Sequence, residues 1–164
     1  MRISFRRSVP SDFPEVRRIT RDAYLHAGHF AADHPYMGVL EDVEHRAEHA
    51  QVWVGESAGR MVAAVTLTFA EQPYSEIAQD GELEFRMLAV DPPHQGGGLG
   101  QAVVRAVIEH ARQLPGIKAI SITSATFMER AHCLYESRGF RRAPERDWYV
   151  PGEDVLLWVF RLEL

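Results

Sequence analysis

The spacing of hydrophobic residues along the chain changes several times between the period of a strand and the period of a helix. The weakly alternating residues 2–9 predict a strand, and a helix follows that Gly28 ends. A second helix is expected over 38–49. Further strands are expected over 51–55, 60–68, 82–90 and 118–123, further helices over 98–114 and 127–138, and two last strands from Phe140 onward and over 155–164.

The resulting order, β-α-α-β-β-β-α-β-α-β-β, predicts an α/β (α+β) fold in which helices cover the faces of a mixed sheet. A chain of 164 residues has room for one hydrophobic core, so we expect a single domain over residues 1–164. Residues 69–81 form a long connection with Pro73 and Gly81, and connections of this length are often binding loops.

Composition narrows the class of protein. Hydrophobic residues make up 46% and charged residues 25%, which is typical of a globular chain. No apolar run is long enough for a transmembrane helix, and no apolar stretch follows the basic N-terminus as in a signal peptide. We therefore expect a soluble, cytoplasmic protein that does not bind a membrane.

Charge and cysteine content exclude two further classes. A net charge of -5 argues against a nucleic-acid partner, because phosphate neutralisation needs a basic face. The single cysteine, Cys133, excludes a disulfide framework and a cysteine-based zinc module. We expect Cys133 to be a small residue of the core.

The segment most indicative of function is VDPPHQGGGLG, residues 90–100, where a predicted strand ends and an amphipathic helix begins. Glycines let backbone N–H groups approach a ligand closely, and the first N–H groups of a helix carry partial positive charge. We therefore expect an anion-binding site here, for which phosphate is the usual ligand. The dinucleotide pattern does not fit, since Gln101 replaces its third glycine, and the P-loop pattern does not fit without a lysine.

The pattern that fits is Gln95-x-x-Gly98-x-Gly100, which resembles the acyl-CoA pyrophosphate signature Q/R-x-x-G-x-G/A of the GNAT N-acetyltransferase superfamily. A second segment, AHCLYESRGF over 131–140, is similar to the family's A-x-x-L-Y-E-x-x-G-F at the expected spacing. One departure is Met128, where many members carry an asparagine. The element order also agrees. The resemblance covers nearly the whole chain and implies a mostly antiparallel sheet of about 6–7 strands flanked by about 4 helices.

The resemblance implies acetyl-CoA as the co-substrate. Its pantetheine arm would pair with the backbone of the strand before the turn, and the Leu88 N–H would polarise the acetyl carbonyl. Main-chain N–H groups of the turn would bind the pyrophosphate. The implied cofactor-binding residues are Leu88, Ala89, Val90, Gln95, Gly96, Gly97, Gly98, Leu99 and Gly100.

The implied reaction is direct transfer of an acetyl group to a primary amine, which must first lose a proton. Glu84 corresponds to the position where some members carry a general-base glutamate; Glu82 on the same strand face, or a water relay, are the alternatives. Either acid could instead form an ion pair with Arg86. Tyr135 would protonate the departing CoA thiolate, because a phenol is neutral at pH 7.

The resemblance also implies that residues 24–45 line the acceptor side. The substrate-contact candidates are His26, His29, His34, Tyr36, Tyr74 and Glu82. Acidic stretches over 33–56 and 71–91 indicate either solvated faces or a field that favours a cationic amine. Family members often dimerise through late strands, so the expected partners are a small-molecule or peptide amine and possible homodimer formation.

Two other functions stay open. HRAEH at 45–49 matches the H-x-x-E-H motif of some zinc peptidases, but no third ligand is specified, and we expect no metal. A non-catalytic acyl-CoA-binding or regulatory module on the same fold would keep the glycine turn. Loss of turnover with retained CoA binding would distinguish that module from an enzyme.

Overall fold

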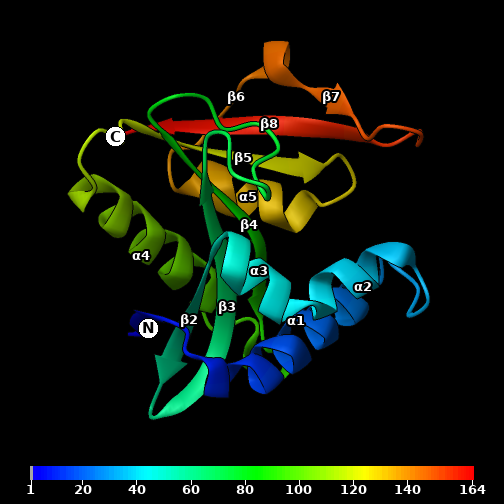
Figure 1. Ribbon diagram of the computed structural model, residues 1–164, viewed down its shortest axis with the longest axis vertical. Coiled ribbons are helices and arrows are strands. Elements are labelled where there is room, and N and C mark those ends of the chain that lie inside the picture. The colour runs from blue at the N-terminus through cyan, green and yellow to red at the C-terminus, as the bar shows by residue number, and fades with distance from the viewer. Residues whose placement is uncertain (1) are drawn as a thin grey trace. The chain divides into compact units, whose positions relative to one another are not determined.

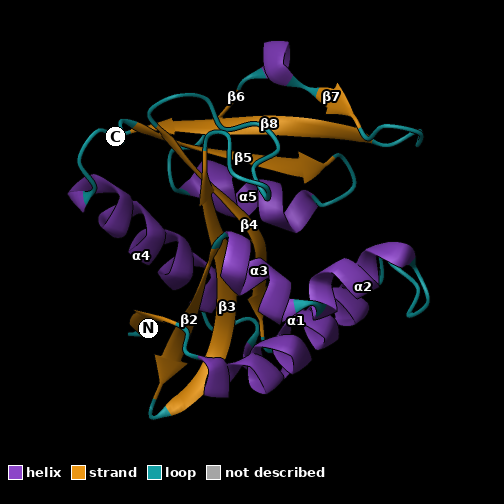
Figure 2. Ribbon diagram, in the orientation of Figure 1, coloured by secondary structure: helices purple, strands orange, loops and turns teal. Residues whose placement is uncertain are grey.

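The computed structural model describes residues 2–164, which contain five α-helices and eight strands (Figures 1 and 2). These residues divide into two compact units. Unit 1 combines the residues up to Leu67 with Met87–Val103, and unit 2 combines Thr68–Arg86 with Val104–Leu164. The single domain over 1–164 stays a prediction.

Unit 1 is built on antiparallel strand pairs and three helices. Its sheet follows the order β1-β2-β3-β4, with β1 antiparallel to β2 and β2 antiparallel to β3. Its elements are β1 (Ser4–Arg7), α1 (Phe13–Ala27), α2 (Pro35–Glu41), α3 (Val43–His49), β2 (Gln51–Ser57), most of β3 (Arg60–Phe69), the second half of β4 (Glu82–Val90) and the start of α4 (Leu99–Gln113).

The core of unit 1 forms where helices pack on strands. Val16 of α1 and Val43 of α3 pack with Val52 and Val54 of β2, and all four are buried. Burying an aliphatic side chain of this size contributes about 1.5–3 kcal/mol. Figure 1 shows α1, α2 and α3 next to one another in this unit. As predicted, Gly28 ends α1, with a φ of 79° that a glycine adopts without strain.

The prediction of one helix over 38–49 is wrong, because two helices, α2 and α3, meet at Asp42. The backbone of Asp42 leaves the helical region, with φ -83° and ψ 69°, and its carboxylate accepts a hydrogen bond from the His45 N–H at 3.2 Å. Arg46 is buried and donates to the carbonyls of Val39 and Leu40, near the end of α2. These two polar side chains stabilise the junction.

Unit 2 contains the first half of β4, most of α4 and the last five elements of the chain. Those elements are β5 (Ala119–Ala125), α5 (Glu129–Ser137), β6 (Arg141–Arg142), β7 (Trp148–Tyr149) and β8 (Leu156–Glu163). The strand order is β4-β5-β8-β6, and β7 also pairs with β8. The β4–β5 pair is parallel, whereas β8 runs antiparallel to each of its neighbours (Figure 2).

Helix α5 packs on β8 through aromatic rings. The Tyr135 ring lies 5.9 Å from that of Phe160, and the His132 ring lies 5.2 Å from those of Trp158 and Phe160. The expectation that Cys133 is a core residue is wrong: Cys133 is exposed, and its neighbour His132 is buried. The His132 Nε2 lies 3.0 Å from the Ala125 carbonyl, so its ring has a polar partner in the core.

The predicted fold class is confirmed. The described residues form a mixed α/β fold with a mostly antiparallel sheet, and the counts exceed the expected 6–7 strands and 4 helices. The extra helix comes from the division at Asp42, and the short β7 adds a strand. Within residues 2–164, no helix is both long enough and apolar enough to cross a membrane.

Candidate functional site

Strand β4 is continuous over Glu82–Val90 but contains one irregular residue, Met87. Its parallel ladder with β5 covers only the three pairs from Glu82–Ala119 to Glu84–Ser121. Further along, Met87 has a φ of 57°, in the left-handed region that a side chain with a Cβ disfavours by about 1–2 kcal/mol. Strained residues of this kind cluster at functional sites. After it, Leu88 and Val90 are half-buried and Ala89 is buried.

The glycine turn that follows β4 in unit 1 is open to solvent. A 3₁₀ turn over Pro92–His94 leads to residues 95–98, which are exposed, and α4 begins at Leu99. Gly96 and Gly98 have φ values of 85° and 82°, and no atom lies within 4 Å of the position that a Cβ would take. The turn therefore offers exposed backbone at the start of a helix, the arrangement that binds anions.

Helix α1 holds the beginning of this turn. Asp91 is buried, and its carboxylate forms an ion pair with Arg18 at 2.9 Å. The Asp91 N–H donates to the Val62 carbonyl on β3 at 2.8 Å. Gln95 folds back and donates from its side chain to the Val90 carbonyl at 2.9 Å. Sequence reasoning missed the Arg18 contact, because no local pattern links two residues that lie 73 positions apart.

Tyr135 of unit 2 lies in an aromatic cluster. Its ring is 5.8 Å from that of Phe85 on β4 and 6.0 Å from that of Phe140, and only 8% of the residue is exposed. Burial raises the pKa of the Tyr135 hydroxyl. Within residues 2–164 the hydroxyl has no hydrogen-bond partner. A neutral phenol without an internal acceptor can donate its proton to a ligand.

Glu84 is fully buried and accepts hydrogen bonds from four donors. Its carboxylate accepts from the Ser75 hydroxyl at 3.0 Å and from three consecutive backbone N–H groups, those of residues 76–78, at 3.0–3.2 Å. All four donors belong to the connection 69–81. This geometry is that of a carboxylate that orders a loop, and it leaves the general-base role of Glu84 a prediction without geometric support.

Glu82 lies on the same strand face and is 2% exposed. Its carboxylate pairs with Arg146 at 2.9 Å and Arg161 at 3.0 Å, and it accepts from the Gln79 N–H. Burial raises the pKa of Glu82, but these hydrogen bonds outweigh it and lower the pKa from 4.5 to about 2. A carboxylate this acidic is a weak base at neutral pH.

The third polar side chain of this strand face also holds the loop. Arg86 donates to the Tyr74 carbonyl at 3.0 Å and pairs with Glu76 at 3.1 Å. The alternative ion pair of Arg86 with Glu82 or Glu84 does not form, and Arg86 pairs with a loop residue instead. Sequence reasoning did not single out Glu76 as a site residue, because nothing in a polar loop distinguishes one acidic residue from the next.

The predicted acceptor-side residues fall into both units. His26 and His29 are exposed at the end of α1. Tyr36 packs against Phe30 at 5.5 Å, and His34 accepts from the Tyr36 N–H at the start of α2. Tyr74 belongs to unit 2 and is 9% exposed. The first four residues therefore gather around α1 and α2, whereas Tyr74 lies in the connection 69–81.

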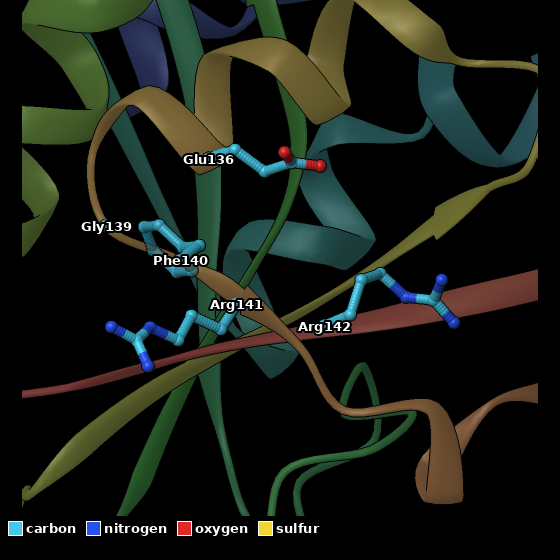
Figure 3. A pocket seen from close by; sticks show the side chains of 5 residues that line it. All are labelled: Glu136, Gly139, Phe140, Arg141 and Arg142. Carbon is cyan, nitrogen blue, oxygen red and sulfur yellow. The ribbon is translucent and has the colours of Figure 1, made fainter.

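Two other features involve residues outside the glycine turn and β4. The rings of His45 and His49 lie 4.4 Å apart on α3, but within residues 2–164 no group of three or more possible ligands is placed to hold a metal ion. A hollow of about 480 Å³ lies where α5 ends and β6 begins, lined by Glu136, Gly139, Phe140, Arg141 and Arg142 (Figure 3).

The hollow contains none of the predicted site residues. In Figure 3 the two arginines point in opposite directions from neighbouring positions of β6. Arg142 forms an ion pair with Asp147, and its guanidinium carbon lies 4.1 Å from the centre of the Trp158 ring. These contacts tie Arg142 to β8 and the segment before it, so the side chain has a structural role.

Comparison with known proteins relates the chain to acetyltransferases. A mycothiol acetyltransferase from Propionibacterium freudenreichii is 30% identical over 146 residues, 87% of this chain and 44% of that protein. An N-acetylaspartate synthetase from Danio rerio is 35% identical over 101 residues, 61% of this chain and 33% of that protein. The chain thus spans less than half the length of these curated relatives.

A solved structure agrees over the full length. An acetyltransferase from Bacillus subtilis in complex with CoA has a TM-score of 0.72 at 17% identity, with 99% of both chains covered. This likeness shows the fold. The family model described as "Acetyltransferase (GNAT) family" matches residues 13–140, which include the glycine turn and α5. The chain belongs to the GNAT acetyltransferase family.

Proposed function

We propose that this protein is an N-acetyltransferase that transfers an acetyl group directly from acetyl-CoA to a primary amine. The observation that carries the proposal is the glycine turn after β4. Its exposed backbone lies directly before the first residue of α4, an arrangement that can bind a pyrophosphate through main-chain N–H groups. The CoA bound by the Bacillus subtilis acetyltransferase supports the same ligand for this chain. The proposed pyrophosphate contacts are the main-chain N–H groups of Gln95–Gly100.

The pantetheine arm is proposed to pair with the backbone of Leu88–Val90. Because Met87 breaks the regular extended conformation, the strand after it differs in direction from a regular strand. The Leu88 N–H then polarises the acetyl carbonyl and stabilises the negative charge that develops on its oxygen. Gly96 and Gly98 let the turn follow the two phosphates without a side chain in the way.

Tyr135 is the proposed general acid. The amine nitrogen attacks the thioester carbonyl, the C–N bond forms, and the C–S bond breaks. The leaving CoA thiolate takes the proton of the Tyr135 hydroxyl. Burial, which raises the pKa of Tyr135, keeps the phenol neutral at working pH, and the lack of an internal partner within residues 2–164 leaves its proton available.

The proposed acceptor is a small-molecule or peptide amine. The names of the relatives support this class, since aspartate carries a primary amine and mycothiol acetyltransferase transfers an acetyl group. The acidic stretches 33–56 and 71–91 favour an acceptor that arrives as a cation. A cytoplasmic location and a homodimer stay predictions from the sequence.

The test measures the acetyl-CoA-dependent release of CoA thiol with a panel of amines: spermidine, aspartate, glucosamine and a peptide with an N-terminal alanine. We expect at least one amine to raise thiol release above the acetyl-CoA-only rate, and Tyr135→Phe to lower kcat with little change in the acetyl-CoA KM. An unchanged kcat would remove Tyr135 as the acid. Acetyl-CoA binding without turnover of any amine would favour the non-catalytic acyl-CoA-binding module.

A further inference from the structure

The connection 69–81 is held against one strand by three side chains of the same face. Glu82 accepts from the Gln79 N–H, Glu84 from the N–H groups of residues 76–78, and Arg86 donates to the Tyr74 carbonyl. Every second residue of this part of β4 thus anchors the loop. A loop with so many main-chain anchors has one preferred conformation.

The anchored loop brings Glu76 over the centre of that face. The Glu76 carboxylate pairs with Arg86 through Oε1 at 3.1 Å, and its own N–H donates to Glu84. Residue 76 as a whole lies at the surface, but its side chain rests against Arg86 and is 28% exposed. It is therefore the carboxylate of this cluster that a ligand can reach, whereas Glu82 and Glu84 are buried.

The charges of the cluster suit an amine. The Glu76 carboxylate pairs with Arg86 but is 28% exposed, so an ammonium group can approach its negative charge from solvent. Partial burial raises the pKa of Glu76, Arg86 lowers it, and the neighbouring Glu84 raises it. A carboxylate that is less acidic than usual is a better proton acceptor near neutral pH.

Resting on the proposed function, we propose that Glu76 is the group that takes the proton of the incoming amine, and that Glu84 is a positioning residue that holds it there. In this step the N–H bond of the ammonium breaks, and the proton passes to the Glu76 carboxylate. The nitrogen keeps the electron pair and attacks the thioester. The neutral Glu76 carboxyl group then returns the proton to solvent.

The first test compares isosteric variants in the thiol-release assay. Glu76→Gln is expected to lower kcat/KM about 10²-fold and to remove the acidic limb of its pH profile, since general-base catalysis contributes about that much. Glu76→Asp should restore part of the rate. Glu109→Gln, an exposed acid on α4 outside the acidic stretches, is the control and should match the wild type.

The role of Glu84 predicts a different pattern. Glu84→Gln should speed amide hydrogen exchange at residues 76–78 and lower kcat/KM while keeping the acidic limb, because Glu76 is still present. A profile that loses its acidic limb in Glu84→Gln and keeps it in Glu76→Gln would overturn the proposal and favour Glu84 as the base. A Glu76→Gln variant within about twofold of wild type would also overturn it.

A second measurement does not depend on the acceptor. With ¹³C-labelled glutamate, the carboxyl signal that disappears in Glu76→Gln should titrate above 4.5 in the wild type and higher still in Arg86→Gln. A Glu76 signal that titrates at or below 4.5 would overturn the proposal. If the wild type acetylates no amine, the proposed function fails; if it does and Glu76→Gln is unaffected, only the role of Glu76 fails.

Discussion

The ion-pair cluster around Glu82 predicts a large, pH-dependent contribution to stability. In Glu82→Gln the buried side chain loses its charge while Arg146 and Arg161 keep theirs. The two guanidinium groups are 14% and 32% exposed, so water solvates part of the charge that is left unpaired. The variant tests whether this cluster, and not the neighbouring hydrophobic core alone, joins β4, β8 and the segment around Arg146.

The magnitude follows from the pKa of Glu82. A decrease from 4.5 to about 2 corresponds to roughly 3 kcal/mol at pH 7, at about 1.4 kcal/mol for each tenfold change in acidity. Because the folded-state pKa is lowered, this stability is fully present above 4.5 and is lost as the pH falls towards 2. At pH 3 about 1.4 kcal/mol of it should be left.

Urea denaturation of the wild type and Glu82→Gln at pH 7, 4.5 and 3 measures the difference directly. We expect about 3 kcal/mol at pH 7 and less than half of that at pH 3. The exposed Glu71→Gln is the control and should change little. A difference that is below 1 kcal/mol at pH 7, or that is the same at pH 3, would refute the reasoning.

Two further predictions concern the cofactor and the acceptor. Asp91→Asn removes the ion pair with Arg18 that holds the glycine turn. It should raise the acetyl-CoA Kd, measured by calorimetry, several-fold and lower the free energy of unfolding by about 1 kcal/mol. The control is Glu15→Gln, which removes an exposed ion pair of the same arginine and should leave the Kd unchanged. If a cationic amine is steered by the acidic surface, kcat/KM for spermidine should fall as the salt concentration rises; a flat profile would argue against steering.

The alternation of β4 predicted its faces correctly but not the partners of its polar residues. Glu82 and Glu84 lie on one face, as expected, since both accept hydrogen bonds from the connection 69–81. The two arginine partners of Glu82 stand 64 and 79 positions away. Three of the four donors to Glu84 are backbone groups of a loop, which no side-chain pattern reports. A sequence shows that a strand face is polar, while tertiary contacts decide whether it reacts or binds.

Two local errors have identifiable causes. The helical spacing of apolar residues over 38–49 continues through Asp42 and therefore does not show the boundary between the two helices. Only the residue type of Asp42 indicates it, because aspartate favours helix starts. In α5, residue type alone predicted Cys133 to be in the core. The buried face of this helix instead carries His132, whose ring packs on Trp158 and lies within hydrogen-bond distance of the Ala125 carbonyl. Propensity is overridden where tertiary packing supplies a partner.

The glycine turn was found from sequence because its chemistry is local. A strand end, glycines with positive φ and a helix start stand within ten residues, and each leaves its own signal. The ion pair of Asp91 with Arg18 and the position of Glu76 were not found, because both depend on the folding of distant or irregular segments.

The most direct test of acetyl-CoA binding at the glycine turn is thermal unfolding with and without excess acetyl-CoA. At 100 times its Kd a ligand adds about 2.7 kcal/mol, which for a chain of this size raises Tm by roughly 5–10 °C. Gly98→Leu and Gly28→Leu form a matched pair, since both glycines have φ near 80° and open space at the Cβ position. We expect acetyl-CoA to stabilise the wild type and Gly28→Leu but not Gly98→Leu; no shift in the wild type, or an equal shift in both variants, would contradict the account.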